Sequence, residues 1–486
     1  MKTLSVIKGV KITEIIGNLP EYVSFVTDSS EKVKTGSLFF VRKGNNYDGK
    51  DYIEDAVKNG ATVVVGEEYF EGAPCFIKVE NSDESMTAIL DNFYSSPQKK
   101  LKIIGVVGTN GKTSVCHIIA SILSNCGIKT GIIGTIGVYY DGKKRDISLT
   151  TPGRFELYEY LSKMVKAKVE VVVMEVSAHA IAQNRTDGIY FEELIFTNCT
   201  EDHLDYFKTF KEYSKVKKSI FKKENAKYLI VNADDESGEE IIKENAEVFS
   251  YGLYNPSDVF AIDIEESFQG TTFYLNLLDY VTEVRTKLLG EYNVYNSLAS
   301  LTGTSLLGVS VKRVVCALEQ TPPVKGRCEK VGEINGGIVF LDYAHTPDGL
   351  LKTLETLRKI CTGKLYSLFG CGGNRETQKR EIMGGISALN ADFTIITDDN
   401  PRFENAETIR GEIEKGVLKQ GGKYVNIEGR KNAIKYGVSL LTKGDVLLVA
   451  GKGEESYQEI MGKKYDYSDR KEIEKTINEI NSEASK

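Results

Sequence analysis

KIIGVVGTNGKTSVCHIIASILSN, residues 102–125, combines an apolar run, a glycine-containing loop and a helix-like segment, and indicates the fold class more directly than any other part of the chain. Its first apolar run ends at Val107 and predicts a buried strand, and the apolar periodicity from Lys112 to about Asn125 predicts a helix. The loop between them contains glycines that let backbone amides converge on phosphate oxygens, and it lies at a helix N-terminus whose dipole favours anions. The residues predicted to contact phosphate are Gly108, Thr109, Asn110, Gly111, Lys112, Thr113 and Ser114.

This loop departs by one position from the G-x-x-x-x-G-K-[ST] pattern, because Val106 stands where the first glycine belongs. The strand before it and the helix after it supply the structural context that the pattern requires. Lys112 can neutralise the β- and γ-phosphates, and the hydroxyl of Thr113 can hold Mg²⁺. We therefore predict a nucleotide site of a kind that ligases, switch GTPases and partitioning ATPases share.

The composition bounds the size and class of the protein. Its 486 residues suffice for roughly three domains that each bury their own core. Hydrophobic residues at 41% and charged residues at 27% are near the averages for soluble globular chains and exclude disordered, collagen-like and coiled-coil classes. The 62 Lys and Arg against 69 Asp and Glu give a net charge of −7, so no nucleic-acid partner is expected.

No segment of the sequence predicts export or membrane insertion. Residues 1–20 are broken by Lys8, Lys11 and Glu14 and lack the apolar core of a signal peptide. No later segment approaches the roughly 18 uninterrupted apolar residues of a membrane-spanning helix. The eight cysteines form no C-x-x-C pair, so neither a zinc site nor a disulfide framework is predicted. We expect a cytoplasmic protein without a membrane partner.

Two breaks divide the chain. Ser95–Lys100 is a linker-like segment after a region of short β-like runs, and Thr321-Pro322-Pro323 is a second break. Between the breaks, buried-type strands alternate with helix-length segments, which predicts an α/β fold with a parallel sheet covered on both faces. After the second break we expect another α/β series, with strands at Ile338–Asp342, Leu365–Phe369, Phe393–Thr397 and Asp445–Ala450.

Two other strands of the central region end in side chains suited to a metal site. The run VVVMEVS, residues 171–177, places Glu175 at the carboxyl end of a strand, where a parallel sheet positions ligands beside a phosphate loop. Glu175 is therefore a candidate Mg²⁺ ligand, although an acid at this position could instead cap the next helix. The strand Leu194–Asn198 leads to His203, which is either a second ligand at this edge or a structural histidine.

Lys217 occupies the middle of an inward-facing helical stripe. Tyr213, Lys217 and Phe221 recur at positions i, i+4 and i+8, which is the spacing of one helix face. By spacing alone, this lysine either reaches back to solvent past its apolar neighbours or serves the site.

A series of motifs then follows in one order along nearly the whole chain. They are GTNGKTS (108–114), TTP (150–152), EVSAHA (175–180), QNR (183–185), TEDHLDY (200–206), GEYNVYN (290–296), KGRCE (325–329), DYAHTPD (342–348), GCGGNRE (370–376), DDNPR (398–402) and GKGEESYQ (451–458). Together they resemble the Mur ligase family. The resemblance implies three domains, namely a UDP-sugar-binding domain at 1–98, an ATP-binding ligase domain at 99–322 and a Rossmann-like amino-acid-binding domain at 323–486.

The resemblance is strongest to the members that add the third amino acid of the peptidoglycan stem peptide. It implies an ATP-dependent carbon–nitrogen ligase that joins meso-diaminopimelate to UDP-N-acetylmuramoyl-L-alanyl-D-glutamate, and so serves cell-wall formation, cell shape and division. In the family mechanism, ATP phosphorylates a carboxylate and the amine displaces phosphate through a tetrahedral intermediate. ATP is then a co-substrate, Mg²⁺ is the cofactor, and the enzyme is expected to be a cytoplasmic monomer.

By the same resemblance, the catalytic residues are Lys112, Glu175, His203 and Lys217. Thr113, Glu175, His203 and Lys217 serve the metal sites, with Lys217 matching a lysine that is carbamylated to N6-carboxylysine. Further ATP contacts are implied for Asn296, Arg327, Asp342 and His345. The UDP-muramoyl-dipeptide contacts implied are Ser29, Asn45, Asn46, Tyr47, Thr150, Thr151, Ser177, Gln183 and Arg185.

For the incoming amino acid, Arg402 matches the residue that binds the distal carboxylate of meso-diaminopimelate. An arginine suits that role because its planar fork pairs with a carboxylate. Glu455 is suited to the distal ammonium. The other matching contacts are Arg375, Asp399, Asn400, Pro401 and Gly451.

Several positions depart from the family pattern. Asn374 interrupts the common GGDR, Glu454 interrupts the common GKGHE, Ser30 replaces the arginine of DSR, and Ala178 replaces a frequent serine. Asn374 and Glu454 alter the charge beside the amino-acid pocket, so L-lysine or another amino acid is a competing substrate hypothesis. Two competing functions are a folate polyglutamate synthetase, which usually reads GTNGKGS and lacks DNPR, and a P-loop nucleotide switch.

Overall fold

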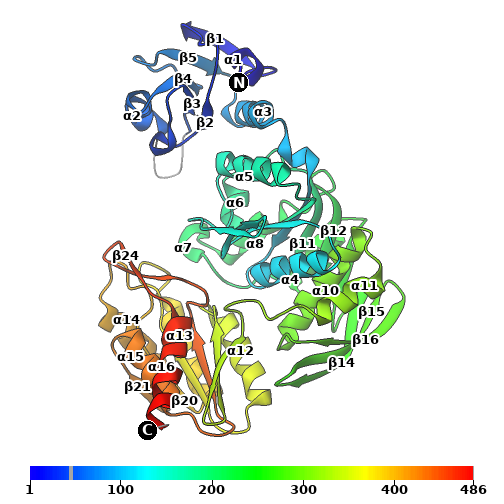
Figure 1. The fold of residues 1–486 in the computed structure, drawn as a ribbon, viewed down its shortest axis with the longest axis vertical. Helices are drawn as coiled ribbons and strands as arrows, with labels where there is room; N and C mark the ends of the chain where they lie inside the picture. The colour runs from blue at the N-terminus through cyan, green and yellow to red at the C-terminus, as the bar shows by residue number, and fades with distance from the viewer. Residues whose placement is uncertain (43–47, 485–486) are drawn as a thin grey trace.

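The computed structural model describes residues 1–42 and 48–484, which form three units that each contain a large β-sheet. Figure 1 shows the units stacked along the longest axis, with the N-terminal unit in blue, the central unit in cyan and green, and the C-terminal unit in yellow to red. This confirms the three-part α/β architecture predicted from the sequence. In the described part of the chain, no helix is long and apolar enough to cross a membrane.

The N-terminal unit has a five-stranded sheet with the order β1-β5-β4-β3-β2, in which only the β1–β5 pair is antiparallel. Its last helix, α3, leads to Ser95 and Ser96, which both have left-handed backbone conformations with φ of 60° and 46°. The elements are α1 (Thr3–Val6), β1 (Ile12–Gly17), β2 (Phe25–Thr27), β3 (Ser37–Phe40), α2 (Ile53–Lys58), β4 (Ala61–Gly66), β5 (Cys75–Val79) and α3 (Ser82–Tyr94).

The central unit contains an 11-stranded sheet whose middle is parallel, in the order β13-β12-β11-β6-β10-β7. β6 (Lys102–Val107) and β10 (Val171–Glu175) match the predicted strands, and β7 (Thr130–Gly134) pairs with β10. The other parallel strands are β11 (Phe191–Phe196), β12 (Ala226–Asn232) and β13 (Phe249–Gly252).

Antiparallel strands extend this sheet at both edges, which the sequence analysis did not predict. They are β8 (Gly137–Tyr140), β9 (Lys143–Arg145), β14 (Val259–Ser267), β15 (Gly270–Leu277) and β16 (Tyr280–Thr286). Of these, β14 is antiparallel to β15 but pairs in parallel with β13. Much of β14 and β16 is exposed, so these strands lack the continuous apolar run of a strand that is buried on both faces.

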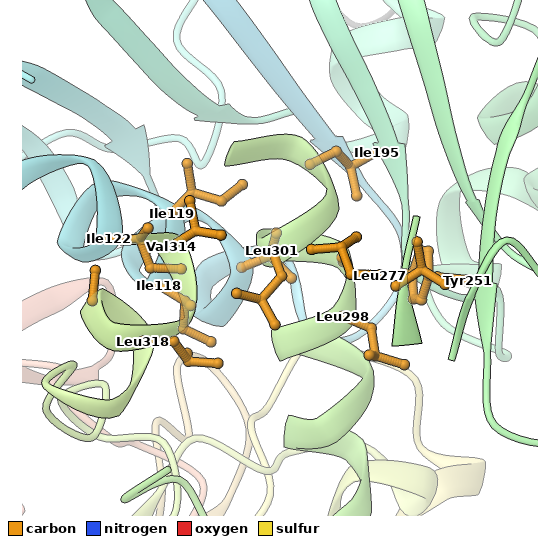
Figure 2. Close-up of a cluster of buried hydrophobic side chains, with 14 of the residues drawn as sticks. Ile118, Ile119, Ile122, Ile195, Tyr251, Leu277, Leu298, Leu301, Val314 and Leu318 are labelled. Atoms are coloured by element: carbon orange, nitrogen blue, oxygen red, sulfur yellow. The ribbon is translucent and has the colours of Figure 1, made fainter. Parts of the chain in front are cut away.

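The core of the central unit fixes the helix that follows β6. Figure 2 shows side chains of α4 (Lys112–Asn125), α10 (Glu291–Leu306) and α11 (Val311–Glu319) packed together against the sheet. Ile118 and Leu301, from the first two of these helices, are fully buried. Burial of each such side chain stabilises the fold by about 1.5–3 kcal/mol. This packing holds the N-terminus of α4 at the end of β6.

Buried hydroxyl groups allow α10 to lie inside the protein. Ser297, Ser300, Thr302 and Thr304 are fully buried, and each donates a hydrogen bond of 2.7 Å to the carbonyl four residues earlier. These bonds satisfy the hydroxyls without partners outside the helix. The remaining helices of the unit are α5 (Arg154–Lys166), α6 (Ala178–Ala182), α7 (Leu204–Phe207), α8 (Phe210–Lys218) and α9 (Glu236–Glu244).

The C-terminal unit has a six-stranded sheet with the order β17-β18-β22-β19-β20-β21, in which only β17 is antiparallel. Four strands confirm the predicted positions to within one residue, namely β18 (Gly337–Asp342), β19 (Leu365–Phe369), β20 (Phe393–Ile396) and β22 (Val446–Ala450). The other elements are β17 (Glu329–Ile334), α12 (Pro347–Ile360), α13 (Gln378–Asn390), α14 (Ala406–Lys419), β21 (Tyr424–Asn426), α15 (Arg430–Ser439), the hairpin of β23 (Tyr457–Ile460) and β24 (Lys463–Asp466), and α16 (Asp469–Ala484).

Candidate active site

A cavity of about 580 Å³ lies between the central and C-terminal units, and both units supply its lining. Most of the residues predicted for nucleotide and amino-acid binding face this one space. They are Thr109, Asn110, Gly111, Lys112, Thr113, Ser114, Arg327, His345, Arg375, Asp399, Asn400, Arg402, Gly451 and Glu455. The lining also includes Glu175 and His203, predicted for the metal sites, and Thr150 and Ser177, predicted for the muramoyl dipeptide. Segments that are far apart in sequence therefore meet here, as expected for a ligand site at a domain interface.

The phosphate loop between β6 and α4 has two positions that require glycine. A Cβ at Gly108 would lie 1.9 Å from Thr197 Oγ1, and Gly111 has a φ of +85°. Lys112 Nζ donates to the carbonyl oxygens of Gly108 and Thr109, both at 2.8 Å. Burial lowers the pKa of Lys112 below its usual value. The lysine is therefore folded over the loop, where it can meet phosphate oxygens.

Glu175 lies at the end of β10 as predicted, and it is 2% exposed. Its Oε1 accepts hydrogen bonds from Thr113 Oγ1 at 2.9 Å and from Thr135 N at 2.8 Å, and its Oε2 accepts from Thr135 Oγ1 at 3.1 Å. A Cβ at Gly134 would lie 2.2 Å from Oε1, so a glycine is needed on the neighbouring strand. The carboxylate and the Thr113 hydroxyl are thus adjacent oxygen donors, a donor set that fits Mg²⁺.

His203 precedes α7 and has a left-handed backbone conformation with φ of 57°. Its ring centroid lies 4.8 Å from that of His179 in an edge-to-face arrangement, and its Nε2 lies 3.5 Å from Asp202 Oδ2. The aromatic contact with His179 orients the ring beside the phosphate loop.

Lys217 on α8 is 1% exposed and does not reach solvent. Its Nζ donates to Thr109 Oγ1 at 2.6 Å and lies 4.0 Å from the ring centroid of Tyr213. Burial lowers the pKa of Lys217 to about 7, because the charged form is poorly solvated there. The hypothesis that this side chain reaches back to solvent is therefore wrong. The amine lies next to the phosphate loop but outside the cavity lining.

Protein side chains alone do not form a complete metal site. Among residues 1–42 and 48–484, no group of three or more His, Cys, Asp and Glu side chains could hold a metal ion. A divalent ion at Thr113 and Glu175 would thus share its coordination with phosphate oxygens and water, which is the usual arrangement for Mg²⁺.

Contacts between the units reach the phosphate loop directly. Arg327 Nη2 donates to Thr113 Oγ1 at 3.0 Å, and its guanidinium lies 4.5 Å from the ring centroid of Tyr343. Asn110 Nδ2 donates to Asp348 Oδ2 at 2.9 Å, from the first turn of α12. The phosphate loop of the central unit is therefore contacted by a guanidinium and a carboxylate from the C-terminal unit.

Two of the residues predicted for the nucleotide have structural contacts outside the cavity lining. Asp342 is 7% exposed, and its carboxylate accepts from the backbone amides of Cys328 and Ala344, the latter at 2.6 Å. Burial raises its pKa. Asn296 on α10 is buried, donates to Asn293 Oδ1 at 2.9 Å, and has its Oδ1 2.6 Å from the place of a Cβ on Gly111. Asn296 therefore packs beneath the phosphate loop.

The residues predicted for the muramoyl dipeptide form a hydrogen-bonded group around the end of β10. Thr151 Oγ1 donates to Glu175 O at 2.8 Å, and Arg185 Nη1 donates to Thr151 O at 2.9 Å. Arg185 Nη2 also donates to Gln183 Oε1 at 2.7 Å. Thr150 and Ser177 line the cavity, whereas Thr151, Gln183 and Arg185 lie behind them.

Arg154 is a residue of this region that the sequence analysis missed. It is 2% exposed, begins α5 just after the TTP motif, and donates to Asn184 O at 3.0 Å through its Nε. Its Nη1 donates to Asp83 O at 3.0 Å and to Thr87 Oγ1 at 3.1 Å, both on α3. Arg154 thus joins the N-terminal unit to the two dipeptide segments.

The amino-acid loop, which we define as Gly451–Glu455, closes the far side of the cavity. Glu455 Oε2 accepts from Lys452 Nζ at 2.8 Å and from Asn400 Nδ2 at 3.0 Å. Burial opposes ionisation of Asp399, but the charges of Lys452 and Arg430 hold its pKa below the usual value. These bonds join the DNPR segment to the amino-acid loop.

A hydrogen bond and an ion pair within the protein orient the side chain of Arg402. Its Nη1 donates to Gly373 O at 2.8 Å, its Nε lies 3.4 Å from Glu459 Oε2, and its φ is +52°. Pro401 is buried and accepts a backbone hydrogen bond from Glu404 N at 3.0 Å. The guanidinium of Arg402 lines the same cavity as the phosphate loop.

The residues predicted for the uridine side lie in the N-terminal unit, away from this cavity. Ser29 is half-buried, follows β2, and its backbone amide donates to Thr27 Oγ1 at 3.1 Å. Asn45, Asn46 and Tyr47 lie outside the described residues.

A phosphate loop at the end of a parallel strand, facing a second unit across one cavity, defines an enzyme that uses a nucleoside triphosphate at a domain interface. Three sequence matches give the family. Residues 106–303 match the Mur ligase middle domain, residues 326–453 match the Mur ligase glutamate ligase domain, and residues 22–93 match the domain described as Mur ligase family, catalytic domain. The chain belongs to the Mur ligase family, whose members are ATP-dependent acid–amino-acid ligases.

The relatives extend over the whole chain. The UDP-N-acetylmuramoyl-L-alanyl-D-glutamate–2,6-diaminopimelate ligase 1 of Clostridium acetobutylicum is 42% identical and covers 97% of this chain and 98% of the relative. The corresponding ligase of Clostridium tetani is 39% identical over 99% of this chain and 100% of the relative. A solved structure of a ligase with this name is 28% identical, with a TM-score of 0.69 over 99% of both chains.

Proposed function

We propose that this protein is an ATP-dependent ligase that joins meso-diaminopimelate to UDP-N-acetylmuramoyl-L-alanyl-D-glutamate in peptidoglycan synthesis. The observation that supports this function best is the single cavity, because it brings the phosphate loop, the dipeptide segment at Thr150 and the DNPR segment at Arg402 together. ATP phosphorylates the substrate carboxylate, and the amine of the amino acid then displaces the phosphate. A closed interface protects the acyl phosphate from water.

In this proposal Lys112 neutralises phosphate charge, and Thr113 with Glu175 holds a first Mg²⁺. The adjacent hydroxyl and carboxylate oxygens support that assignment. Mg²⁺ would withdraw charge from the phosphoryl oxygens, and Arg327 would add a second cation from the C-terminal unit. His203, which lines the same cavity, would serve a further metal site.

Carbamylation of Lys217 is the part of the proposal that this protein's own electrostatics support. Addition of CO₂ to an amine needs the neutral form, and a pKa of about 7 makes that form abundant near neutral pH. The ammonium first loses one proton, and the neutral amine then forms an N–C bond with CO₂ and releases a second proton, so a buried cation becomes a carboxylate. That carboxylate would provide an oxygen ligand beside Thr109 for a second Mg²⁺.

For the acceptor, we propose that Arg402 binds the distal carboxylate and that Glu455 binds the distal ammonium of meso-diaminopimelate. Arg402 is already oriented by Gly373 and Glu459, which reduces the entropy lost on binding. Lysine lacks the distal carboxylate and would not supply this guanidinium with a ligand.

The remaining assignments complete the proposal. The N-terminal domain, residues 1–98, binds the UDP-sugar, residues 99–322 form the ATP-binding domain, and residues 323–486 bind the amino acid. We propose that the protein works in the cytoplasm as a monomer of 53.9 kDa.

Phosphate release from ATP tests this function. Purified protein with Mg²⁺ and UDP-N-acetylmuramoyl-L-Ala-D-Glu is given meso-diaminopimelate, L-lysine or no amino acid. We expect release that depends on meso-diaminopimelate. Release with lysine alone would overturn the assignment of Arg402 but keep the ligase. Release in a parallel reaction, in which a folate replaces the UDP-dipeptide, would overturn both. Nucleotide binding without acceptor-dependent release would favour the switch.

A further inference from the structure

The first turn of α16 holds the amino-acid loop at its beginning and near its end. Asp469 is fully buried and forms an ion pair of 2.7 Å with Arg430, whose Nη2 donates to Ala450 O, also at 2.7 Å. Ala450 directly precedes the loop. The next residue of α16, Arg470, donates through its Nε to Glu454 Oε1 at 2.9 Å. α16 therefore fixes both where the loop starts and where its fourth residue lies.

Arg470 also reaches the joining segment, which we define as residues 326–329 and which follows the central unit at the start of the C-terminal unit. Its Nη2 donates to Glu329 Oε2, and the same oxygen accepts a hydrogen bond of 2.7 Å from Gly326 N. Gly326 lies directly against the amino-acid loop, because a Cβ there would be 2.6 Å from Glu454 N. One guanidinium thus bridges two carboxylates, which a planar fork can do and an ammonium does less well.

The joining segment contacts the proposed ATP site, and the amino-acid loop lines the proposed amino-acid site. Arg327, next to Gly326, donates to Thr113 in the phosphate loop at 3.0 Å. Glu455, next to Glu454, receives the bonds from Lys452 and Asn400 at the amino-acid side. A continuous series of bonded groups therefore runs from the phosphate loop to the amino-acid loop, with Arg470 at its centre.

We propose that Arg470 is a positioning residue that couples the amino-acid loop to the nucleotide side of the site through Glu454 and Glu329. The inference rests on the proposed function for the identity of the two ligands. It also accounts for Glu454, which departs from the common GKGHE motif. The carboxylate that this departure adds beside the pocket is paired with Arg470, so its charge is compensated within the protein.

Steady-state kinetics of the full chain tests the coupling. The variants are Arg470→Ala, Glu454→Ala and the double variant, with KM measured for meso-diaminopimelate, ATP and the UDP-dipeptide. Each single variant should raise KM for meso-diaminopimelate about tenfold, and the double variant should raise it no further, because the two residues act as one unit. KM for the UDP-dipeptide should change by less than about twofold, since that ligand lies across the cavity.

A matched control lies on the same helix. Lys475→Ala removes an exposed pair with Glu479, at 3.8 Å, without touching the cavity, and should leave all three KM values unchanged. Glu454→Gln keeps the shape of the side chain and removes only the charge. This variant replaces Arg470→Ala in the test if Arg470→Ala fails to fold. It should also raise KM for meso-diaminopimelate.

A binding measurement separates coupling from general damage. In the native protein, a non-hydrolysable ATP analogue should tighten the binding of meso-diaminopimelate, and in Arg470→Ala this effect should disappear. A native protein without such tightening would overturn the proposal. So would an unchanged KM in Arg470→Ala, an effect of Glu454→Ala alone, or an equal rise of all three KM values. Absence of amino-acid-dependent phosphate release in the native protein would instead refute the proposed function, and the coupling with it.

Discussion

Lys217 shows how strongly the surroundings of one residue set its chemistry. The side chain is buried between Tyr213 and Thr109, and burial lowers the pKa of its amine to about 7. Below that pH the ammonium prevails and cannot react with CO₂, whereas above it the neutral amine prevails.

The prediction is that carbamylation of Lys217 rises with pH through about 7. With ¹³C-labelled bicarbonate, a carbamate carbon signal should be strong at about pH 8 and weak at about pH 6. Lys217→Arg should give no signal at either pH, because arginine stays protonated. A signal of equal strength in that variant would assign the carbamate to another lysine.

Arg154 carries a second prediction at this scale. Arg154→Gln removes the guanidinium group that donates hydrogen bonds to Asp83, Thr87 and Asn184. The N-terminal unit and the dipeptide segment then lose the side chain that joins them. We expect KM for the UDP-dipeptide to rise about tenfold while KM for ATP stays within about twofold. Lys129→Gln, which breaks an exposed pair with Asp141, is the control. Equal rises in both KM values would contradict this role.

The sequence could predict some of these residues and not others for a physical reason. Glu175 was predictable because it ends a buried strand near the phosphate loop, which is a local pattern. Arg154 and Arg470 are not marked by any local pattern. Their partners lie as far as 71 and 141 positions away, so only the folded chain brings them together.

At the scale of elements, the phosphate loop depends on glycines that pack against β11 and its following turn. Gly108→Ala would place a methyl group within 1.9 Å of Thr197 Oγ1, which donates to Asn110 O at 2.6 Å. The loop must then move, and we expect ATP affinity to fall at least about tenfold.

Calorimetric titration with ATP and Mg²⁺ measures this effect. Gly411→Ala on α14 is the control, because nothing lies within 4 Å of the new methyl group. That variant should bind ATP normally and gain about 0.5–1 kcal/mol of stability from the higher helix propensity of alanine. Normal ATP binding by Gly108→Ala would contradict the account of the loop.

Strands buried on both faces were predictable from the sequence, whereas exposed strands at the sheet edges were not. The strands β6, β10, β18 and β19 are short apolar runs buried on both faces, so the sequence indicates them directly. The edge strands β9, β14 and β16 expose much of their length and carry no such run. Their place is set by pairing with the neighbouring strands β8, β13 and β15, which is a tertiary effect.

For the whole molecule, the decisive feature is that both units line the candidate active-site cavity. Arg327 crosses from one unit to Thr113 of the other, so the site is complete only when the units are together. We expect Arg327→Ala to lower kcat about 100-fold, because a cation near the transferred phosphoryl group is lost. KM for the UDP-dipeptide should change little. Lys330→Ala, which breaks an exposed pair with Glu333, is the control and should leave kcat unchanged.

The proposed reaction of this protein attaches meso-diaminopimelate to the UDP-muramoyl dipeptide. The most direct test offers purified protein, ATP and Mg²⁺ an equimolar mixture of meso-diaminopimelate and L-lysine with UDP-N-acetylmuramoyl-L-Ala-D-Glu, and identifies the product by mass spectrometry. We predict a tripeptide product that carries diaminopimelate almost exclusively, because only this acceptor has a distal carboxylate for the proposed pairing with Arg402. A product that carries lysine, or no tripeptide at all, would contradict the account.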